Sequence, residues 1–257
     1  MAQRDADRIP DKGTTSRTEP VLAPIAIRRD REIYSADGAW FQARWHFSFD
    51  RYYDPENMGV GKLRVFNHDT LVPGAIWPMH PHRDVEGITY VVAGRFEHAD
   101  SLNNGGVLLP GGVQRMTLGS GALHSERNYS KTEPMQFIQM WIMPDRRGLP
   151  PSVEQRQHSE EDRHNKLLQI VRPEGIEGTG VTVHQDVSMH ASRLDPGVTV
   201  RHEFGGGRGG YLYLMEGDVE LNGQRMMSGD AAKITAAGLL RIRSRATSEL
   251  ILVDTPL

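Results

Sequence analysis

The hydrophobic pattern of the first half of the chain consists of short segments of strand length. Apolar and polar residues alternate, or apolar residues run together, over residues 62–66, 88–92, 116–118 and 135–142. A period of two is typical of β-strands, because successive side chains on a strand point to opposite faces. Glycine-rich turns lie between these segments, at residues 103–106 and 111–112. The spacing predicts an all-β sandwich or barrel.

The second half repeats this organisation. Strands are predicted at residues 167–171, 181–185, 211–215, 219–221 and 249–253. The run Tyr-Val-Val-Ala-Gly that ends at Gly94 is matched by Tyr-Leu-Met-Glu-Gly ending at Gly217. The spacing from Gly112 to Gly121 also recurs, from Gly229 to Gly238. Internal repetition of this kind predicts two similar β domains in tandem.

The composition of the remaining segments gives the predicted boundaries. Residues 1–26 are polar and without periodicity, so we expect a disordered or loosely attached tail. The first domain is predicted at residues 27–145 and the second at residues 167–257. Between them, residues 146–166 are rich in proline at the start and highly polar afterwards, which is typical of a linker or a short surface helix.

Two pairs of candidate metal ligands lie in the first domain. His80 and His82 are one residue apart, and so are His124 and Glu126. Side chains at positions i and i+2 of a strand leave from the same face, so each pair can aim at one point. Because two such pairs occur in one strand-rich region, the sequence predicts a metal site with four ligands.

The types of ligand narrow the choice of metal. Three imidazoles and one carboxylate suit Fe(II), Mn(II), Cu(II), Ni(II) or Zn(II) rather than Ca(II) or Mg(II). On an octahedral ion, four protein ligands leave two positions for water, a substrate oxygen or O2. The internal repeat places Arg241 and Arg243 where His124 and Glu126 stand, and Glu203 and Gly205 where the histidine pair stands. We therefore expect one metal ion per chain, in the first domain only.

Charge and composition exclude several classes of function. The chain has 30 basic and 33 acidic residues and a net charge of -3, which gives no electrostatic reason to expect a nucleic-acid or membrane partner. It has no cysteine, which excludes disulfides and thiolate chemistry. No secretory or membrane-spanning apolar run is present, so a cytoplasmic location is expected. The oligomeric state is left open.

The motifs around the candidate ligands resemble the pirin family. They are Tyr52-Tyr53-Asp54-Pro55, His80-Pro81-His82-Arg83-Asp84, His98-Ala99-Asp100-Ser101, His124-Ser125-Glu126 and Gln139-Met140-Trp141-Ile142-Met143-Pro144. The resemblance covers about residues 27–255, and the sequence is most similar to the bacterial pirin-like quercetinases, chiefly through Asp84-Val85-Glu86. It implies a bicupin, with two tandem double-stranded β-helix barrels.

The resemblance also implies a chemistry. A single metal ion, usually iron in pirins, would be held by His80, His82, His124 and Glu126. The activity implied is that of a quercetin 2,3-dioxygenase, for which a flavonol and O2 are the substrates. Glu126, at the edge of the metal, would be the catalytic base that takes the proton of the flavonol 3-hydroxyl. In many pirins a tryptophan precedes Met116, where this chain has Arg115, so we expect a changed pocket mouth.

The sequence is also compatible with two other functions. Eukaryotic pirins are nuclear iron proteins that modulate transcription factors, which gives the alternative of an iron-binding regulatory or protein-binding module without significant catalysis. A cupin of the sugar-isomerase type would need phosphate-binding side chains near the pocket, for which Arg83 and Arg115 are candidates. Oxygen consumption and loss of flavonol absorbance by the iron-loaded protein separate these functions from a dioxygenase.

Three further residues are candidates for a supporting role. Glu86 shares the alternation parity of His80 and His82, so it either hydrogen-bonds a ligand imidazole or is a solvated strand carboxylate. His46 and His98 lie in strand-like segments that can reach the pocket. For both of these histidines, a packed or surface position is the more common case.

Overall fold

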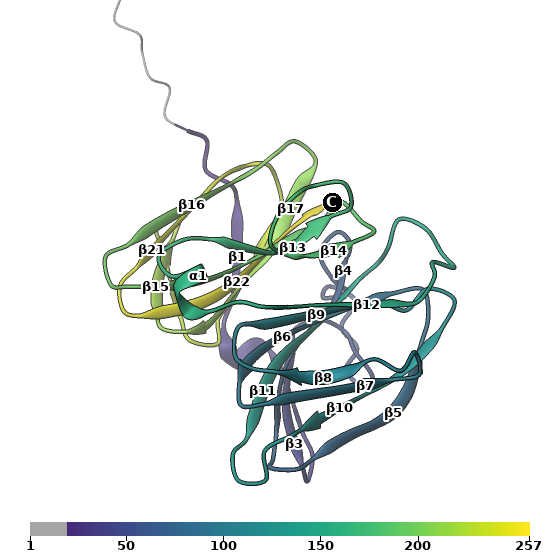
Figure 1. Ribbon diagram of the computed structural model, residues 1–257. Helices are drawn as coiled ribbons and strands as arrows, with labels where there is room; N and C mark the ends of the chain where they lie inside the picture. The colour runs from purple at the N-terminus through teal and green to yellow at the C-terminus, as the bar shows by residue number, and fades with distance from the viewer. Residues whose placement is uncertain (1–19) are drawn as a thin grey trace, which may run out of the picture.

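The computed structural model describes residues 20–257, which form two β-barrels packed against each other (Figure 1). The all-β bicupin prediction is confirmed. The predicted tail, residues 1–26, falls largely outside the described residues. No helix within residues 20–257 is both long and apolar enough to cross a membrane.

The first barrel is made of one large and one small antiparallel sheet, the lower lobe in Figure 1. The large sheet has the strand order β12 (Ser152–Gln157), β9 (Gly112–Thr117), β6 (Glu86–Ala93), β11 (Met135–Ile142), β4 (Leu63–Leu71), β3 (Phe41–Trp45) and β2 (Tyr34–Asp37). The small sheet has the order β5 (Ile76–His82), β10 (Ala122–Asn128), β7 (Phe96–Asp100) and β8 (Gly105–Leu108). The small sheet carries all the candidate metal ligands.

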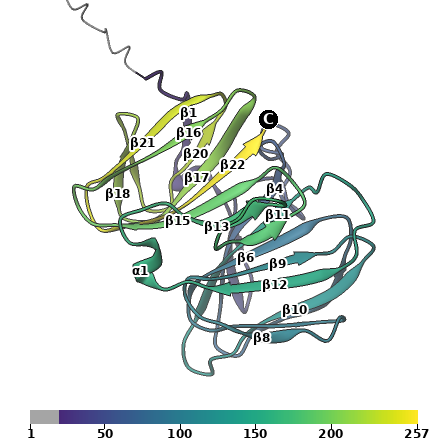
Figure 2. The same cartoon turned by 45° about the horizontal axis from the view of Figure 1, so that its top comes forward.

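The second barrel also has one large and one small sheet, which are antiparallel except for one parallel pair at the end of the large sheet. Its large sheet has the order β1 (Ile25–Arg28), β20 (Ala231–Ile234), β17 (Arg208–Glu216), β22 (Ser248–Pro256), β15 (Ser188–Leu194), β13 (Leu168–Pro173) and β14 (Val181–Val183). Its small sheet has the order β16 (Thr199–Phe204), β21 (Gly238–Ser244), β18 (Asp218–Leu221) and β19 (Gln224–Met227). A short 3-10 helix (Asp30–Glu32) follows β1, and α1 (Glu160–Arg163) lies at the junction of the barrels (Figure 2).

Two strands occur in segments whose composition did not predict them. β12 falls within the range predicted as a linker, yet it pairs with β9 from Ser152 opposite Thr117 to Gln157 opposite Gly112. Its side chains are exposed or half-buried, as on an edge strand, so backbone pairing rather than an apolar face holds it. β1 comes from the start of the chain but pairs with β20 of the second barrel.

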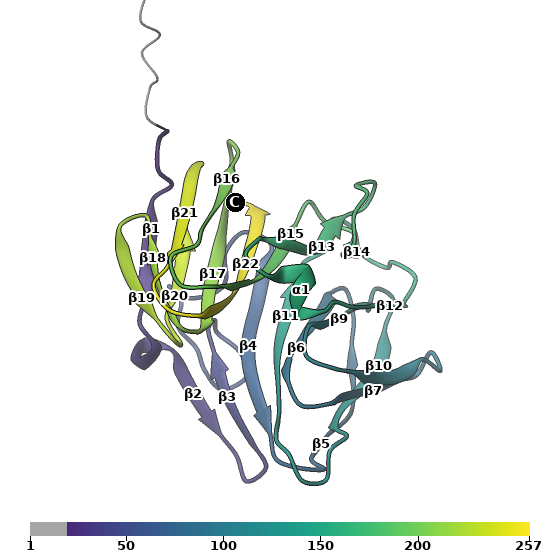
Figure 3. The same cartoon turned by 60° about the vertical axis from the view of Figure 1, so that its left-hand side comes forward.

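The largest apolar cluster lies between the two barrels. It joins residues of the first barrel such as Phe66 and Tyr90 to residues of the second such as Tyr211, Tyr213 and Val253. Figure 3 shows β4 running beside β17 along this junction. The rings of Phe66 and Tyr211 lie 5.4 Å apart in an edge-to-face arrangement. Burial of such side chains, worth about 1.5–3 kcal/mol each, holds the barrels together.

The two faces of β4 have different neighbours. Phe66 and His68 face the second barrel, where His68 Nδ1 lies 2.9 Å from the hydroxyl of Tyr213. The residues of opposite parity, Asn67 and Asp69, line the cavity of the first barrel. Because side chains alternate along a strand, one element both closes the cavity and forms the interface.

The glycines of the internal repeat occupy equivalent turns. Gly94 ends β6 with φ 79°, and Gly217 ends β17 with φ 109°. A Cβ atom on either residue would lie 2.6 Å from a backbone oxygen, that of Pro134 or of Thr247. Both a positive φ and a close approach of backbone therefore require glycine at these two positions.

The predicted equivalence of Arg241 and Arg243 with His124 and Glu126 is wrong by one residue. In the first barrel His124 pairs with His80 and Ala122 with His82. In the second barrel the matching pairs are Leu240 with His202 and Gly238 with Phe204. Arg241 and Arg243 are exposed, on the opposite face of β21 from the buried Leu240 and Ile242. A slip of one residue exchanges the two faces of a strand.

Candidate metal centre and cavity

Three histidines converge at the small sheet of the first barrel. His80 and His82 lie on β5 and His124 on β10, and one nitrogen of each ring lies within 4.8 Å of the others. The ring centroids are 4.8 Å apart for His80 and His82, and 4.5 Å apart for His80 and His124. Within residues 20–257 this is the one group of three or more potential ligands that is close enough to share a metal ion.

The surroundings prepare these rings to bind a cation. His80 Nδ1 lies 2.7 Å from the carbonyl oxygen of Pro78 and donates to it, which leaves Nε2 free to face the centre. Burial, with neighbouring histidines, lowers the pKa of His82 to about 4 and the pKa of His124 to about 3. Both rings are therefore neutral at pH 7 and offer a lone pair.

Glu126 is a buried carboxyl group beside the three rings. Its Oε1 lies 3.3 Å from His124 Nδ1, and its Oε2 has no hydrogen-bond partner within residues 20–257. Burial raises the pKa of Glu126 to about 8, and the nearby Asp69 adds to this rise. A register shift in the pairing of β10 with β5 lies between His124 and Glu126, so the carboxyl group is next to the histidine group and not within it.

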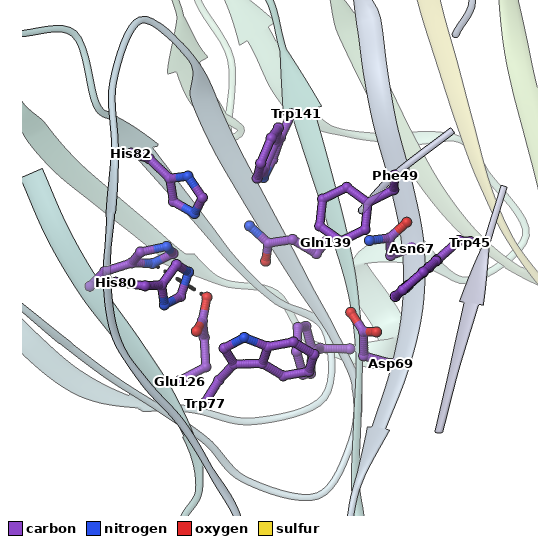
Figure 4. A pocket seen from close by; sticks show the side chains of 12 residues that line it. Trp45, Phe49, Asn67, Asp69, Trp77, His80, His82, Glu126, Gln139 and Trp141 are labelled. Atoms are coloured by element: carbon purple, nitrogen blue, oxygen red, sulfur yellow. Dashed lines mark ion pairs between the residues drawn. The ribbon is translucent and has the colours of Figure 1, made fainter. Parts of the chain in front are cut away.

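The histidines open onto a cavity of about 130 Å³ in the first barrel. Five of its lining residues are tryptophan or phenylalanine: Trp45, Phe49, Trp77, Phe137 and Trp141. Figure 4 shows the ring of Trp141 beside His82, where the centroids lie 4.8 Å apart. Flat aromatic walls favour a planar apolar molecule.

The cavity also has polar lining residues that sequence analysis missed: Asn67, Asp69 and Gln139. Gln139 Oε1 accepts a hydrogen bond of 2.8 Å from Thr89 Oγ1. The sequence does contain a signal for Asn67 and Asp69. The predicted strand ends at residue 66, but β4 continues to Leu71, and along it Asn67 and Asp69 lie on the same face as Val65. The aromatic wall comes from several distant strands and loops, and no local pattern marks it.

Other sequence candidates lie away from the cavity. His98 is buried and its Nε2 is 2.8 Å from Asp100 Oδ2, while His46 Nδ1 is 2.8 Å from the hydroxyl of Tyr211 at the interface. Both are packed histidines.

Glu86 fits neither of its two interpretations. It is fully buried and accepts hydrogen bonds from Thr117 Oγ1 and from the backbone N–H of His184, each 2.8 Å long. The His184 ring also faces it, with Nδ1 2.8 Å from Glu86 Oε1. Because His184 belongs to the second barrel, Glu86 connects the barrels.

Arg115 also lies outside the cavity. Its Nε donates to the carbonyl oxygen of Thr182 at 2.8 Å, and its Nη1 donates to Thr117 and Ser152. The expectation that it changes the pocket mouth is wrong. Its hydrogen bonds also remove one of the two phosphate-binding candidates of the sugar-isomerase interpretation.

Comparisons with known proteins agree with this architecture. Residues 27–142 match the family model described as Pirin, and residues 169–255 match the one described as Quercetinase C-terminal cupin domain. A quercetin 2,3-dioxygenase of Escherichia coli K12 is 34% identical, over 90% of this chain and 99% of its own length. A pirin-like protein of Caulobacter vibrioides is 37% identical, over 87% of this chain and 96% of its own.

A solved structure of similar fold shows a bound metal. It is a bacterial pirin from Escherichia coli in complex with nickel(II), 33% identical, with a TM-score of 0.85 and coverage of 91% of this chain and 99% of its own. Both the sequence matches and this structure extend over the two barrels. The chain therefore belongs to the pirin family.

Proposed function

We propose that this protein is a metal-dependent dioxygenase that opens the heterocycle of a flavonol such as quercetin with O2. The observation that carries the proposal is a group of three converging histidines that opens onto a cavity with aromatic side chains, beside a buried carboxyl group whose Oε2 has no partner within residues 20–257. The quercetin 2,3-dioxygenase among the relatives supports the reaction and the class of substrate.

The metal ligands that we propose are His80, His82, His124 and Glu126. The donor set fits a divalent ion, because His124 Nε2 and Glu126 Oε2 are buried and have no partner within residues 20–257. We propose Fe(II) as the metal, while the nickel(II) in the similar bacterial pirin supports a site that accepts several first-row ions. A bound ion would supply Lewis acidity at the substrate oxygens.

The proposed work of Glu126 is to move a proton. Its carboxylate would take the proton of the flavonol 3-hydroxyl, which leaves an electron-rich anion for reaction with O2. Burial raises the pKa of Glu126 to about 8 in the metal-free protein, and a bound cation would lower this pKa and keep the carboxylate ionised, so that it can accept a proton. The aromatic walls would hold the flavonol flat and keep water from the anion.

The direct test is an oxygen-electrode assay on protein loaded separately with Fe(II), Mn(II), Cu(II), Ni(II) and Zn(II). With at least one metal, we expect one molecule of O2 to be consumed and one molecule of carbon monoxide to be released for each flavonol lost, as measured by its absorbance. Removal of the metal by chelation should abolish all three signals. Absence of O2 consumption with every metal would exclude a flavonol dioxygenase.

A further inference from the structure

Two polar side chains in the wall of the cavity lack partners. Asp69 is 5% exposed and Asn67 is 4% exposed, and the Oδ1 atom of each has no hydrogen-bond partner within residues 20–257. Figure 4 shows both on one strand, β4, across the cavity from His80 and His82. They belong to the lining of the same cavity as the histidines.

The cavity face of β4 carries the unpartnered oxygens of Asn67 and Asp69, and His68 Nε2 on the opposite face also has no partner within residues 20–257. His68, between these two residues, faces the other way and its Nδ1 lies 2.9 Å from the Tyr213 hydroxyl. Gln139, the neighbour of Asn67 on β11, accepts from Thr89. Buried polar atoms are nearly always satisfied, and an unsatisfied one costs about 1–3 kcal/mol. The protein gives Asp69 Oδ1 no partner, so a molecule in the cavity, either water or a bound ligand, must supply one.

We propose that Asp69, assisted by Asn67, binds a second hydroxyl group of the aromatic substrate, on a part that lies away from the oxygens facing the histidines. This assignment rests on the proposed function, because it takes the substrate to be a flavonol. It makes polyhydroxylated flavonols the preferred substrates over those that carry the 3-hydroxyl alone.

The chemistry of the surroundings favours a hydroxyl as the partner. Trp45, Trp77 and Phe137 surround the cavity next to Asp69 with apolar rings, so a hydrogen bond there is shielded from water. A phenolic hydroxyl can both donate and accept. Burial raises the pKa of Asp69 to about 7, so near neutral pH this group can take either complementary role.

The test compares two ligands that differ in hydroxyl groups. Quercetin carries hydroxyls on both outer rings, and 3-hydroxyflavone has only the 3-hydroxyl. Binding is measured anaerobically on metal-loaded protein, through quenching of the tryptophans that line the cavity. We expect the Asp69→Leu variant, which removes both carboxylate oxygens, to lose about tenfold in affinity for quercetin and less than twofold for 3-hydroxyflavone. Asp69→Asn should keep most of the quercetin affinity.

Controls separate this role from general effects. Asp37→Leu removes an exposed aspartate and should leave both affinities unchanged. Asn67→Leu should weaken quercetin binding by a smaller factor than Asp69→Leu. If Asp69→Leu fails to fold, the hydroxyl-binding role is tested by two other measurements: the affinity of the unaltered protein for quercetin relative to 3-hydroxyflavone, and the same ratio in Asn67→Leu. Equal affinity of the unaltered protein for both flavonols, or no selective loss in Asn67→Leu, overturns the assignment.

The outcomes also distinguish this inference from the proposed function. Selective, Asp69-dependent binding without O2 consumption overturns the dioxygenase and supports the hydroxyl-binding role. Turnover with equal loss of both flavonols in Asp69→Leu overturns the role and supports the dioxygenase. Failure of both flavonols to bind overturns both.

Discussion

At the scale of single residues, the carboxyl group of Glu126 defines the chemistry proposed for the metal centre. It is buried, its Oε1 lies 3.3 Å from His124 Nδ1, and its pKa is raised to about 8. A group in this position can share a metal ion with the histidines or hold the substrate proton. The two roles predict different losses when the residue is removed.

We expect Glu126→Ala to lower turnover at least about 100-fold, because general-base catalysis contributes this much or more. Metal content should fall less than in His82→Ala, which removes one of the three converging rings. Elemental analysis and the oxygen electrode measure the two effects on the same samples. Near-normal rates in Glu126→Ala would rule out the base assignment.

Asp69 gives a prediction for the pH dependence of stability in the metal-free protein. Burial raises its pKa from 3.8 to about 7, so between these values the folded state binds a proton that the unfolded state has lost. The stabilising contribution is therefore present at low pH and disappears as pH rises through 7. The free energy of unfolding of Asp69→Asn, relative to that of the unaltered protein, should therefore increase by roughly 3 kcal/mol between pH 5 and pH 8.

Urea unfolding at the two pH values measures this difference. Asp37→Asn, at an exposed position, is the matched control and should show a constant difference. A constant difference for Asp69→Asn as well would mean that Asp69 is ionised throughout.

The residues of the site could be predicted to different extents from sequence. The three converging histidines were predicted because an i, i+2 pair on a strand is a local pattern. The roles of Glu126 remain a prediction. Asn67 and Asp69 were missed because the strand pattern was ended too early, and the aromatic wall because its members meet only in the folded barrel.

At the scale of elements, composition was a poor guide where backbone pairing decides. β12 is almost entirely polar, and it is a strand because β9 offers it a free edge. β6 has six consecutive buried residues at its start, since one face lines the first barrel and the other meets the second. Such a strand shows no alternation of apolar and polar residues, so its own sequence does not reveal which side chains point to which face. The one-residue slip in matching β21 to β10 has another origin: both strands alternate in burial, but Gly121 precedes β10 whereas Gly238 is the first residue of β21.

The turn glycine Gly94 gives a prediction at this scale. Gly94→Ala should destabilise the protein by more than about 2 kcal/mol, because the residue needs φ 79° and the new Cβ atom would meet the backbone oxygen of Pro134. Gly223→Ala is the matched control, since Gly223 has φ 84° and nothing within 4 Å of the added Cβ. Its cost should be about 1 kcal/mol, from backbone strain alone. Thermal unfolding should therefore rank the two variants, and equal losses would refute the close-approach argument.

At the scale of the whole molecule, Glu86 links the barrels. It accepts from Thr117 of the first barrel and from the backbone of His184 in the second. Glu86→Ala should cost about 3 kcal/mol, because it leaves buried donors without an acceptor. Glu97→Ala, which removes a partly exposed ion pair with Arg127, should change stability little. Urea unfolding distinguishes the two, and a negligible loss in Glu86→Ala would show that the interface depends on apolar packing alone.

The position of β1 has a consequence for how the chain assembles on the ribosome. Ile25 at the start of this strand pairs with Ile234, so more than two hundred residues are synthesised before its partner strand exists. While the first barrel is being synthesised, β1 therefore has no partner strand. If the gene were divided between the two barrels, β1 would be encoded with the first barrel although it pairs with the second. A shortened protein that contains the first barrel alone would lack β20, so the residues of β1 would have to be removed or given another partner.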